Sequence, residues 1–317
     1  MKLRGIHHIT AIASDPQHNV DFYTNVLGLR LAKRTVNFDD PSTYHLYFGD
    51  RSGQPGTAIT FFAWPGARRG VRGTGQVVAV SFAIPRDSID YWKARFEESH
   101  VFSEQLPSHF DASALRFTDP DGLLLELIES GQPDDVDLNY DSEVPKKFAI
   151  HGFHAPTLEV RDAKPTEDVL KELEFELIAE EKSRRRLSVN PKSTSASVDL
   201  IERPEGQFGI NSAGTVHHIA FRCADAKEQL RWQKKLTELG LNVTPVIDRY
   251  YFHSIYFREP GGILFEIATE GPGFTADEQV KDLGQTLKLP PQYEQHRAEI
   301  ERALPPILIG PKAGDRG

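Results

Sequence analysis

Two stretches of the sequence, GIHHITAIA at residues 5–13 and GTVHHIAFRC at residues 214–223, carry the same His-His pair inside an otherwise apolar strand pattern. Isoleucine, valine, phenylalanine and threonine surround the pairs, and these residue types favour β-strands. A histidine buried in a strand costs free energy unless its ring nitrogens find partners. The same dipeptide in two distant strands therefore indicates a repeated structural unit whose histidines share a task.

The chain contains four copies of this unit. Each copy opens with a short strand, continues into an amphipathic helix and closes with strands, the last of which is apolar with one acidic or polar residue. In the fourth copy, Trp232, Leu236 and Leu239 fall on one helix face. In the third copy, residues 166–178 predict the helix, and the polar residues 180–195 predict a loose or edge hairpin. The copies span about residues 5–64, 75–130, 150–203 and 214–270.

An acidic, proline-containing stretch at residues 131–147 separates the first two copies from the last two, as a linker between domains would. We therefore predict domains at residues 1–135 and 136–272, followed by a tail at 273–317. The last third of the stretch at residues 271–304 is expected to form a surface-packing helix. The predicted fold class is α+β, with four βαβββ repeats in two tandem domains, each forming a curved mixed-sheet cup flanked by helices. Because one unit cannot cover both faces of its sheet, units must pair and leave a cup for a ligand.

Composition and charge restrict the class of ligand. The chain has 317 residues and a formal net charge of −9, which works against nucleic acid or an anionic membrane as a partner. No apolar stretch approaches the roughly 18 residues of a membrane span, and the N-terminus lacks the apolar region of a signal peptide. The single cysteine, Cys223, cannot form an internal disulfide. We expect a cytoplasmic protein that binds a small molecule, and the sequence leaves open whether it forms a homo-oligomer.

Alignment of the four copies defines two corresponding positions in each, one on the first strand and one on the last. If the outer copies share a cup, His8, His218 and Glu266 converge in it. The last-strand position of the first copy holds Thr60 or Phe61, so no second carboxylate joins them. Glu266 stands within the apolar segment GGILFEIA, where a carboxylate needs a partner. Two imidazoles and one carboxylate leave coordination positions open and suit a non-haem Fe(II) oxygenase.

The middle copies offer a second set of candidate ligands. Glu126, His154 and Asp199 occupy their corresponding positions, with Ala79 as the fourth member. Because Ala79 replaces the second histidine, this set is the poorer metal site. We interpret it as a remnant of duplication whose carboxylates are satisfied by nearby arginine or backbone donors, and a second metal site there stays open.

Four segments, GIHHITAIA, TYHLYFGD, TVHHIAFRC and YFREPGGILFEIATE, occur in this order. In this combination the chain resembles the vicinal oxygen chelate superfamily of glyoxalases, bleomycin resistance proteins and extradiol dioxygenases, and within it the hydroquinone-type ring-cleaving dioxygenases. The resemblance covers nearly the whole chain. It implies an Fe(II) site, with Mn(II) as a substitute, formed by His8, His218 and Glu266. It also implies an aromatic diol, above all a hydroquinone, and O2 as substrates, and hence a role in aromatic degradation.

The resemblance further implies residues that act around the metal: Thr10, Arg249, Tyr256 and the companion histidines His7 and His217. Tyr256 would hydrogen-bond the bound oxygens, Arg249 would stabilise developing negative charge, and a companion histidine could shuttle protons. Strand alternation places Thr10 on the face of His8. The same alternation turns His7 and His217 away, so they need a bulge or a bent approach to reach the substrate.

Two other functions stay open. A glyoxalase-type isomerase or lyase would use the metal as a Lewis acid, although Thr60 or Phe61 stands where such a site usually has its fourth protein ligand. A metal-free protein that sequesters an aromatic compound would leave the paired histidines and Glu266 without a task. Oxygen consumption distinguishes the first function from the second, and metal analysis distinguishes both from the third. The choice between catechol and hydroquinone depends on cup-lining residues that the sequence does not place.

Overall fold

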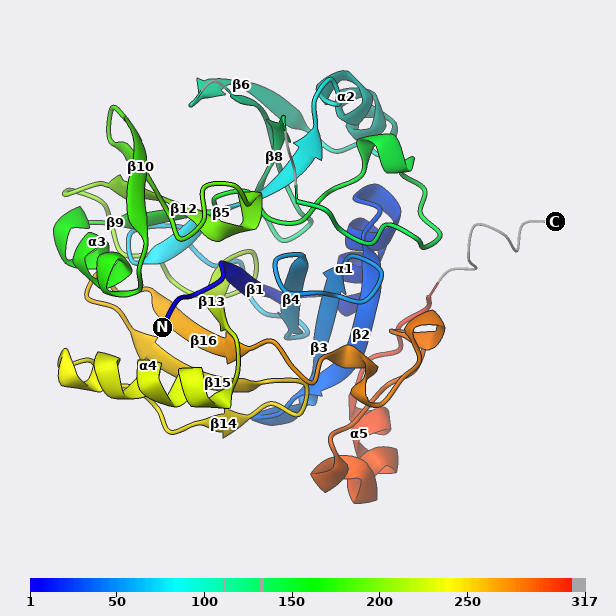
Figure 1. Ribbon diagram of the computed structural model, residues 1–317. Coiled ribbons are helices and arrows are strands. Elements are labelled where there is room, and N and C mark those ends of the chain that lie inside the picture. The colour runs from blue at the N-terminus through cyan, green and yellow to red at the C-terminus, as the bar shows by residue number, and fades with distance from the viewer. Residues whose placement is uncertain (111, 132–133, 310–317) are drawn as a thin grey trace.

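The computed structural model describes residues 1–110, 112–131 and 134–309, which form two eight-stranded mixed sheets with helices packed against them (Figure 1). Gln132 and Pro133 of the predicted linker, and the last eight residues of the predicted tail, lie outside the described residues.

The first sheet combines the first and fourth units, in the order β14-β15-β16-β13-β1-β4-β3-β2. Its strands are β1 (Ile6–Ala13), β2 (Arg30–Asn37), β3 (Asp40–Gly49), β4 (Ala58–Ala63), β13 (Val216–Cys223), β14 (Ile247–Asp248), β15 (His253–Arg258) and β16 (Leu264–Thr269). The antiparallel pair β1–β13 joins the two units, with Ile9 opposite Ile219. This pairing brings the two His-His strands side by side.

The second sheet combines the second and third units in the same way, in the order β10-β11-β12-β9-β5-β8-β7-β6. Its strands are β5 (Gln76–Pro85), β6 (Ser103–His109), β7 (Ala112–Thr118), β8 (Leu124–Ser130), β9 (Thr157–Val160), β10 (Glu176–Glu181), β11 (Arg184–Ser188) and β12 (Ser197–Glu202). Here the antiparallel pair β5–β9 joins the units, with Val77 opposite Leu158. The predicted α+β class with two curved sheets is confirmed, and each sheet takes one unit from each half of the chain.

A helix crosses over from the first strand of each unit, because the last strand runs parallel to the first and needs such a connection. In the first unit, α1 (Pro16–Asp21) starts where the Asp15 carboxylate accepts a hydrogen bond from the His18 N–H. It continues as a π-helix over Phe22–Val26. Gly28 follows with φ +70°, a left-handed conformation that glycine adopts without strain.

The other three crossover helices are α2 (Ile89–Glu98), α3 (Ala163–Glu172) and α4 (Ala226–Glu238). Each presents an apolar face to its sheet, and Trp92 and Trp232 are fully buried. The predicted helix over residues 166–178 is wrong at its end. The chain leaves the helix after Glu172, turns at Glu174 with φ +68°, and enters β10, so the charged residues there form an edge hairpin with β11.

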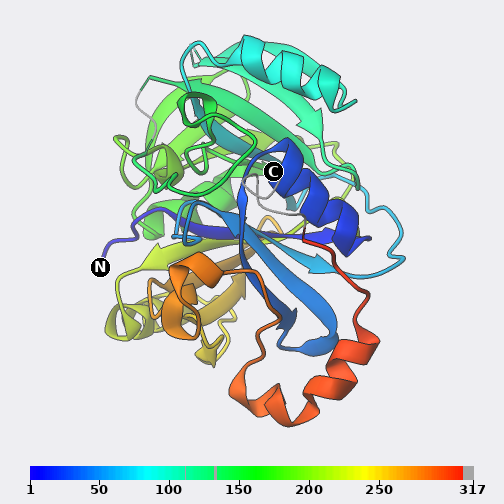
Figure 2. The same cartoon turned by 90° about the vertical axis from the view of Figure 1, so that its right-hand side faces the viewer.

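The predicted surface helix of the tail is α5 (Arg297–Ala303). Figure 2 shows the tail, in orange and red, running past the blue strands of the first unit. Its contacts include the Lys288 N–H, which donates to the Arg34 carbonyl, and the Tyr293 hydroxyl, which donates to the Phe38 carbonyl. In the described part of the chain, no helix has both the length and the apolar character needed to cross a membrane.

Candidate metal centre

Three side chains from adjacent strands converge at the middle of the first sheet. His8 projects from β1, His218 from β13 and Glu266 from β16, and their side chains are 3%, 4% and 0% exposed. The His8 Nε2 lies 3.2 Å from the His218 Nε2 and 3.3 Å from the Glu266 Oε2, and the His218 Nε2 lies 2.9 Å from that oxygen. Within the described residues, they alone form a group of three His, Cys, Asp or Glu side chains with ligand atoms within 4.8 Å of one another.

The donor atoms fit a metal ion. Nitrogen and oxygen ligands bind metals such as zinc at about 2.0–2.2 Å, so atoms on perpendicular bonds are about 3 Å apart, as observed here. The Ser254 hydroxyl donates to the Glu266 Oε1, whereas the Oε2 is buried without a hydrogen-bond partner among the described residues. Burial alone would raise the pKa of Glu266, but His8 and His218 hold it well below its usual range. The centre therefore offers a charged oxygen that faces two ring nitrogens.

The companion His7 determines which nitrogen of His8 is free. The Thr269 carbonyl can only accept a hydrogen bond, so the His7 Nε2 at 3.1 Å must carry the proton. Burial, reinforced by His8, lowers the pKa of His7 to about 3, which leaves its Nδ1 as an acceptor. The His8 Nδ1, 2.9 Å away, must then donate to it. In this tautomer of His8 the Nε2 is a bare lone pair that points at the candidate metal position.

His217 stands in the same relation to His218 but has a different outer environment. Its Nδ1 lies 2.8 Å from the His218 Nδ1, and burial lowers the pKa of His217 to about 3. If His218 presents a bare Nε2, its Nδ1 donates to His217, and His217 carries its one proton on Nε2. His217 lines the central cavity, whereas His7 bonds to a backbone carbonyl. The β1–β13 ladder has register shifts between Ile6 and His8 and between Thr10 and Ala11, where the partner changes from His218 to Val216, so both companion histidines lie at irregularities. Only His217 lines the cavity, because His7 contacts His8 and the Thr269 carbonyl instead.

A cavity of about 410 Å³ opens beside the three side chains. Tyr256 lies on its wall, and the Arg249 Nε donates to the Tyr256 hydroxyl at 3.2 Å. Arg249 also forms an ion pair with Asp39 at 3.0 Å, which links the loop after β14 to the β2–β3 hairpin. Burial, aided by Glu266, raises the pKa of Tyr256, so the hydroxyl keeps its proton. Aromatic rings form much of the remaining wall: Phe38, Tyr47, Phe62, Trp64 and Phe252.

The last-strand position of the first unit is Thr60, not Phe61. In the parallel ladder of β1 and β4, Thr60 lies opposite Thr10, and their hydroxyls are 2.8 Å apart. Phe61 points the other way, against Tyr23 and Phe48 in the apolar core. The predicted site residue Thr10 is therefore fully buried and contacts Thr60.

Two cavity residues, His45 and Tyr47 on β3, were not predicted from the sequence. The signal was present in TYHLYFGD, where polar and apolar residues alternate so that His45 and Tyr47 share one strand face. His45 and Tyr47 lie on a middle strand of the unit, whereas His8, His218 and Glu266 lie on first and last strands.

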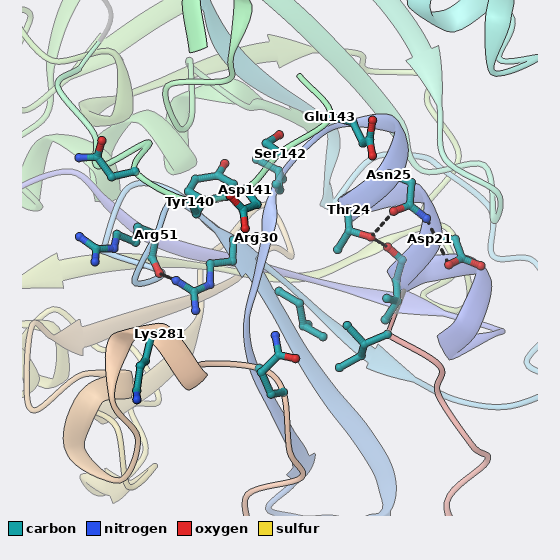
Figure 3. A pocket seen from close by; sticks show the side chains of 17 residues that line it. Asp21, Thr24, Asn25, Arg30, Arg51, Tyr140, Asp141, Ser142, Glu143 and Lys281 are labelled. Carbon is teal, nitrogen blue, oxygen red and sulfur yellow. Dashed lines mark hydrogen bonds between the residues drawn. The ribbon is translucent and has the colours of Figure 1, made fainter. Parts of the chain in front are cut away.

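In the second sheet, the corresponding acids form ion pairs with arginines. The Glu126 carboxylate pairs with Arg116 at 2.8 Å, and the Asp199 carboxylate pairs with Arg184 at 2.8 Å and with Arg186 at 2.7 Å. These contacts agree with the interpretation of a remnant whose acids are neutralised by arginine. A further cavity, of about 320 Å³, lies apart from both groups, between α1, residues 139–143 and the tail (Figure 3). Its Arg30 donates hydrogen bonds to backbone carbonyls of Arg51 and Val280.

Comparison with known proteins gives consistent matches along the chain. A family model described as "Glyoxalase/Bleomycin resistance protein/Dioxygenase superfamily" matches residues 5–127 and 138–267. The chain is 46% identical over 309 residues to "Putative ring-cleaving dioxygenase MhqO" of Bacillus subtilis, with 97% of this chain and 98% of that protein covered. It is 34% identical over 323 residues to "Chlorohydroquinone/hydroquinone 1,2-dioxygenase" of Sphingobium indicum, with 97% and 98% covered.

Solved structures are similar over most of the chain. The crystal structure of a "putative dioxygenase" from Bacillus subtilis matches with a TM-score of 0.93 and 45% identity, over 98% of this chain and 99% of that one. Glyoxalase I from Zea mays matches with a TM-score of 0.62 and 15% identity, over 84% of this chain and 92% of that one, and so shares the fold.

Proposed function

The chain belongs to the glyoxalase/bleomycin resistance protein/dioxygenase superfamily, and on that premise we propose that it is a ring-cleaving dioxygenase that opens an aromatic diol with O2. The proposed substrate class is hydroquinone, with or without ring substituents, in line with the name of the relative from Sphingobium indicum. The proposed metal is a non-haem Fe(II) ion, with Mn(II) as the second candidate, held by His8, His218 and Glu266. The observation that carries the proposal is the meeting of these three donors beside an aromatic-lined cavity.

Each surrounding side chain has a task that follows from its contacts. His7 keeps the Nε2 of His8 bare through the Thr269 carbonyl. Arg249 donates to the Tyr256 oxygen, which leaves the Tyr256 proton available to an oxygen atom in the cavity. Arg249 also brings positive charge to a place where negative charge would develop on the substrate. His217 lines the cavity, and with its Nδ1 accepting from His218 its Nε2 is placed to donate a hydrogen bond to a substrate oxygen.

A bound Fe(II) would supply open coordination positions at which the diol and O2 meet, and a path for electrons from the ring to oxygen. The chain's part is to bind and orient the diol and to limit its exposure to water. Burial of the three donors and the ring-lined wall serve these purposes.

The glyoxalase-type alternative lacks a protein ligand at the fourth position. Thr60 stands there, and its hydroxyl is occupied by Thr10 and His45, each at 2.8 Å. A Lewis-acid isomerase in this superfamily would need another carboxylate or imidazole, and the described cavity lining contributes neither at that position. A dioxygenase uses the open positions for its two substrates instead.

An oxygen electrode tests the proposal directly. Protein loaded anaerobically with Fe(II) should consume one O2 per hydroquinone, whereas metal-free protein should consume none. A panel of substituted hydroquinones and catechols then identifies the preferred ring. Turnover of a substrate without oxygen uptake would support an isomerase or lyase, and purified protein that retains no metal while binding aromatics would support the sequestering function.

A further inference from the structure

A chain of hydrogen bonds begins at the cavity wall, which His45 and Tyr47 both line. The His45 Nδ1 lies 2.9 Å from the Tyr47 hydroxyl, and the His45 Nε2 lies 2.8 Å from the Thr60 hydroxyl. Thr60 in turn lies 2.8 Å from Thr10. Both ring nitrogens of His45 therefore have partners, and this imidazole links Tyr47 to the two threonines.

The strand register makes Tyr47 the counterpart of Tyr256. In the first unit Tyr47 lies opposite Thr60 on the neighbouring strand, and in the fourth unit Tyr256 lies opposite Glu266. The two tyrosines therefore reach the cavity from equivalent places in the paired units. Their partners differ, because Tyr256 bonds to Arg249, which can only donate, whereas Tyr47 bonds to an imidazole nitrogen, which can donate or accept.

The imidazole partner lets Tyr47 change its hydrogen-bonding role. Burial, reinforced by His8 and His218, lowers the pKa of His45 well below its usual range, so the ring is neutral and carries one proton. If that proton is on Nε2, Tyr47 donates to Nδ1 and offers an oxygen lone pair to the cavity. If it is on Nδ1, Tyr47 accepts from His45 and offers its own proton. Neither arrangement places a charge on the wall.

We propose that Tyr47 recognises the hydroxyl of the aromatic diol that does not bind the metal, and that His45 is the residue that positions the Tyr47 hydroxyl. This inference rests on the proposed function, in which one diol oxygen binds the metal near Glu266. A rigid ring then holds its second hydroxyl away from the metal, and β3 supplies the Tyr47 hydroxyl to the same cavity. Phe274 packs on the Tyr47 ring at 4.7 Å between centroids and restricts its motion.

The test compares the binding of hydroquinone with that of phenol, which lacks the second hydroxyl. Dissociation constants are measured by calorimetry with Fe(II)-loaded protein in the absence of O2. The wild type should bind hydroquinone more tightly than phenol, and Tyr47→Phe should lose about 3- to 10-fold of that preference, the range of one hydrogen bond. Phenol affinity and bound iron should not change in Tyr47→Phe. His45→Gln should reduce the same preference, because the glutamine amide does not hold the Tyr47 hydroxyl as the imidazole does.

Tyr44→Phe is the matched control, because Tyr44 is on the same strand but packs into the core. It should leave the ratio of the two affinities unchanged. A merely structural role for His45 or Tyr47 would weaken both ligands equally, and that result would overturn the inference. A wild type that prefers hydroquinone but consumes no O2 would contradict the proposed function and leave this inference standing. If the wild type consumes O2 but the ratio of hydroquinone to phenol affinity is unchanged in both variants, the proposed function stands and this inference is overturned.

Discussion

At the scale of single residues, each His-His pair brings two neighbouring rings into contact, although strand alternation alone would turn them to opposite faces of the sheet. In each pair the second histidine reaches the candidate metal position through its Nε2, and the first bonds to the other nitrogen of that ring. A metal-bound histidine usually donates its other ring N–H to a carboxylate or a backbone carbonyl. Here the preceding histidine in the sequence is the acceptor. This explains why both members of each pair are polar in strands that are otherwise apolar.

Replacing His218 with alanine removes one of the three donor atoms and leaves Glu266 and His8 in a buried site with an open side. We expect the affinity for iron to fall by more than about 10- to 100-fold, the loss that typically follows substitution of a residue bonded to a metal ligand. Turnover should fall with it. Metal analysis of the purified variant measures the loss. Glu126→Gln, which changes the arginine-paired carboxylate of the second sheet, is the control and should keep its iron. Stoichiometric iron in His218→Ala would contradict the ligand assignment.

The companion histidines should separate metal affinity from turnover. His7→Ala removes the group that fixes the His8 tautomer, so iron affinity should fall by about 10- to 100-fold, while kcat of the fully loaded protein should change little. His217→Ala should lower kcat as well, because its ring also faces the cavity. Chelator competition gives the affinity, and oxygen uptake at saturating iron gives kcat. Equal effects of the two substitutions on kcat would show that the different surroundings of the two rings are unimportant.

At the scale of elements, the two sheets have the same topology, but their inward-facing acids have different partners. In the first sheet the inward acid faces two imidazoles, and in the second the inward acids face guanidinium groups. Arg184 and Arg186, which form the ion pairs with Asp199, belong to the neighbouring strand β11. Their side chains therefore lie in the cup of the second sheet. His154 stays beside these groups without a hydrogen-bond partner for its Nδ1 in the described part of the chain.

His154 should make the folded state sensitive to acid. Burial, together with the charge of Arg186, lowers its pKa from 6.5 to about 4, so between these pH values the unfolded chain binds the proton and the folded chain does not. The free energy of unfolding therefore falls as the pH drops from about 6.5 to about 4, by at most about 3 kcal/mol from this group. His154→Gln should flatten this part of the profile. Urea unfolding of metal-free protein at several pH values measures it, with the exposed His18→Gln as control. An unchanged slope in His154→Gln would refute the attribution.

At the scale of the whole molecule, the tail connects the two halves of the first sheet. Lys33 of β2 is fully buried and forms ion pairs with Asp277, at 2.7 Å, and with Glu278. Asp277 also accepts a hydrogen bond from the Tyr251 hydroxyl, and Lys33 lies over the Tyr251 ring. Tyr251 belongs to the loop that carries Arg249, so this buried network holds a segment of the fourth unit against a strand of the first.

Lys33→Met should destabilise the protein strongly, because it leaves Glu278 buried without its partner. The expected loss is about 3–5 kcal/mol in the free energy of unfolding, the range for breaking a buried ion pair. The double variant Lys33→Met, Glu278→Gln should lose less than the sum of the single variants, because the charges act as one unit. Urea unfolding at neutral pH gives both values. A loss below about 1 kcal/mol, or simple additivity, would show that the network is not a structural unit.

Much of this architecture was predictable because it depends on local patterns. The four units and their α+β class follow from repeated spacing, and His8, His218 and Glu266 stand out by residue type in apolar strands. Their convergence followed only on the condition that the outer units share a cup, which the pairing of β1 with β13 meets. The end of the third helix was not predictable, because residues 173–178 are compatible with a helix by propensity, whereas residues 176–178 pair with the edge of β11 as part of β10. The contributions of His45 and Tyr47 depend on where β3 lies relative to the opposite unit.

The sequence by itself determined what each unit would be and which residues carried unusual chemistry for a strand, since periodicity and residue type act over a few residues. Only the tertiary structure decided which units share a sheet, because pairing of β1 with β13 joins segments about 210 residues apart in the chain. It also decided which ring nitrogen of His8 is bare, because that depends on the Thr269 carbonyl of another unit. Hydrogen bonds between distant strands have no signature in local sequence, and in this protein they determine which face of each histidine is available for chemistry.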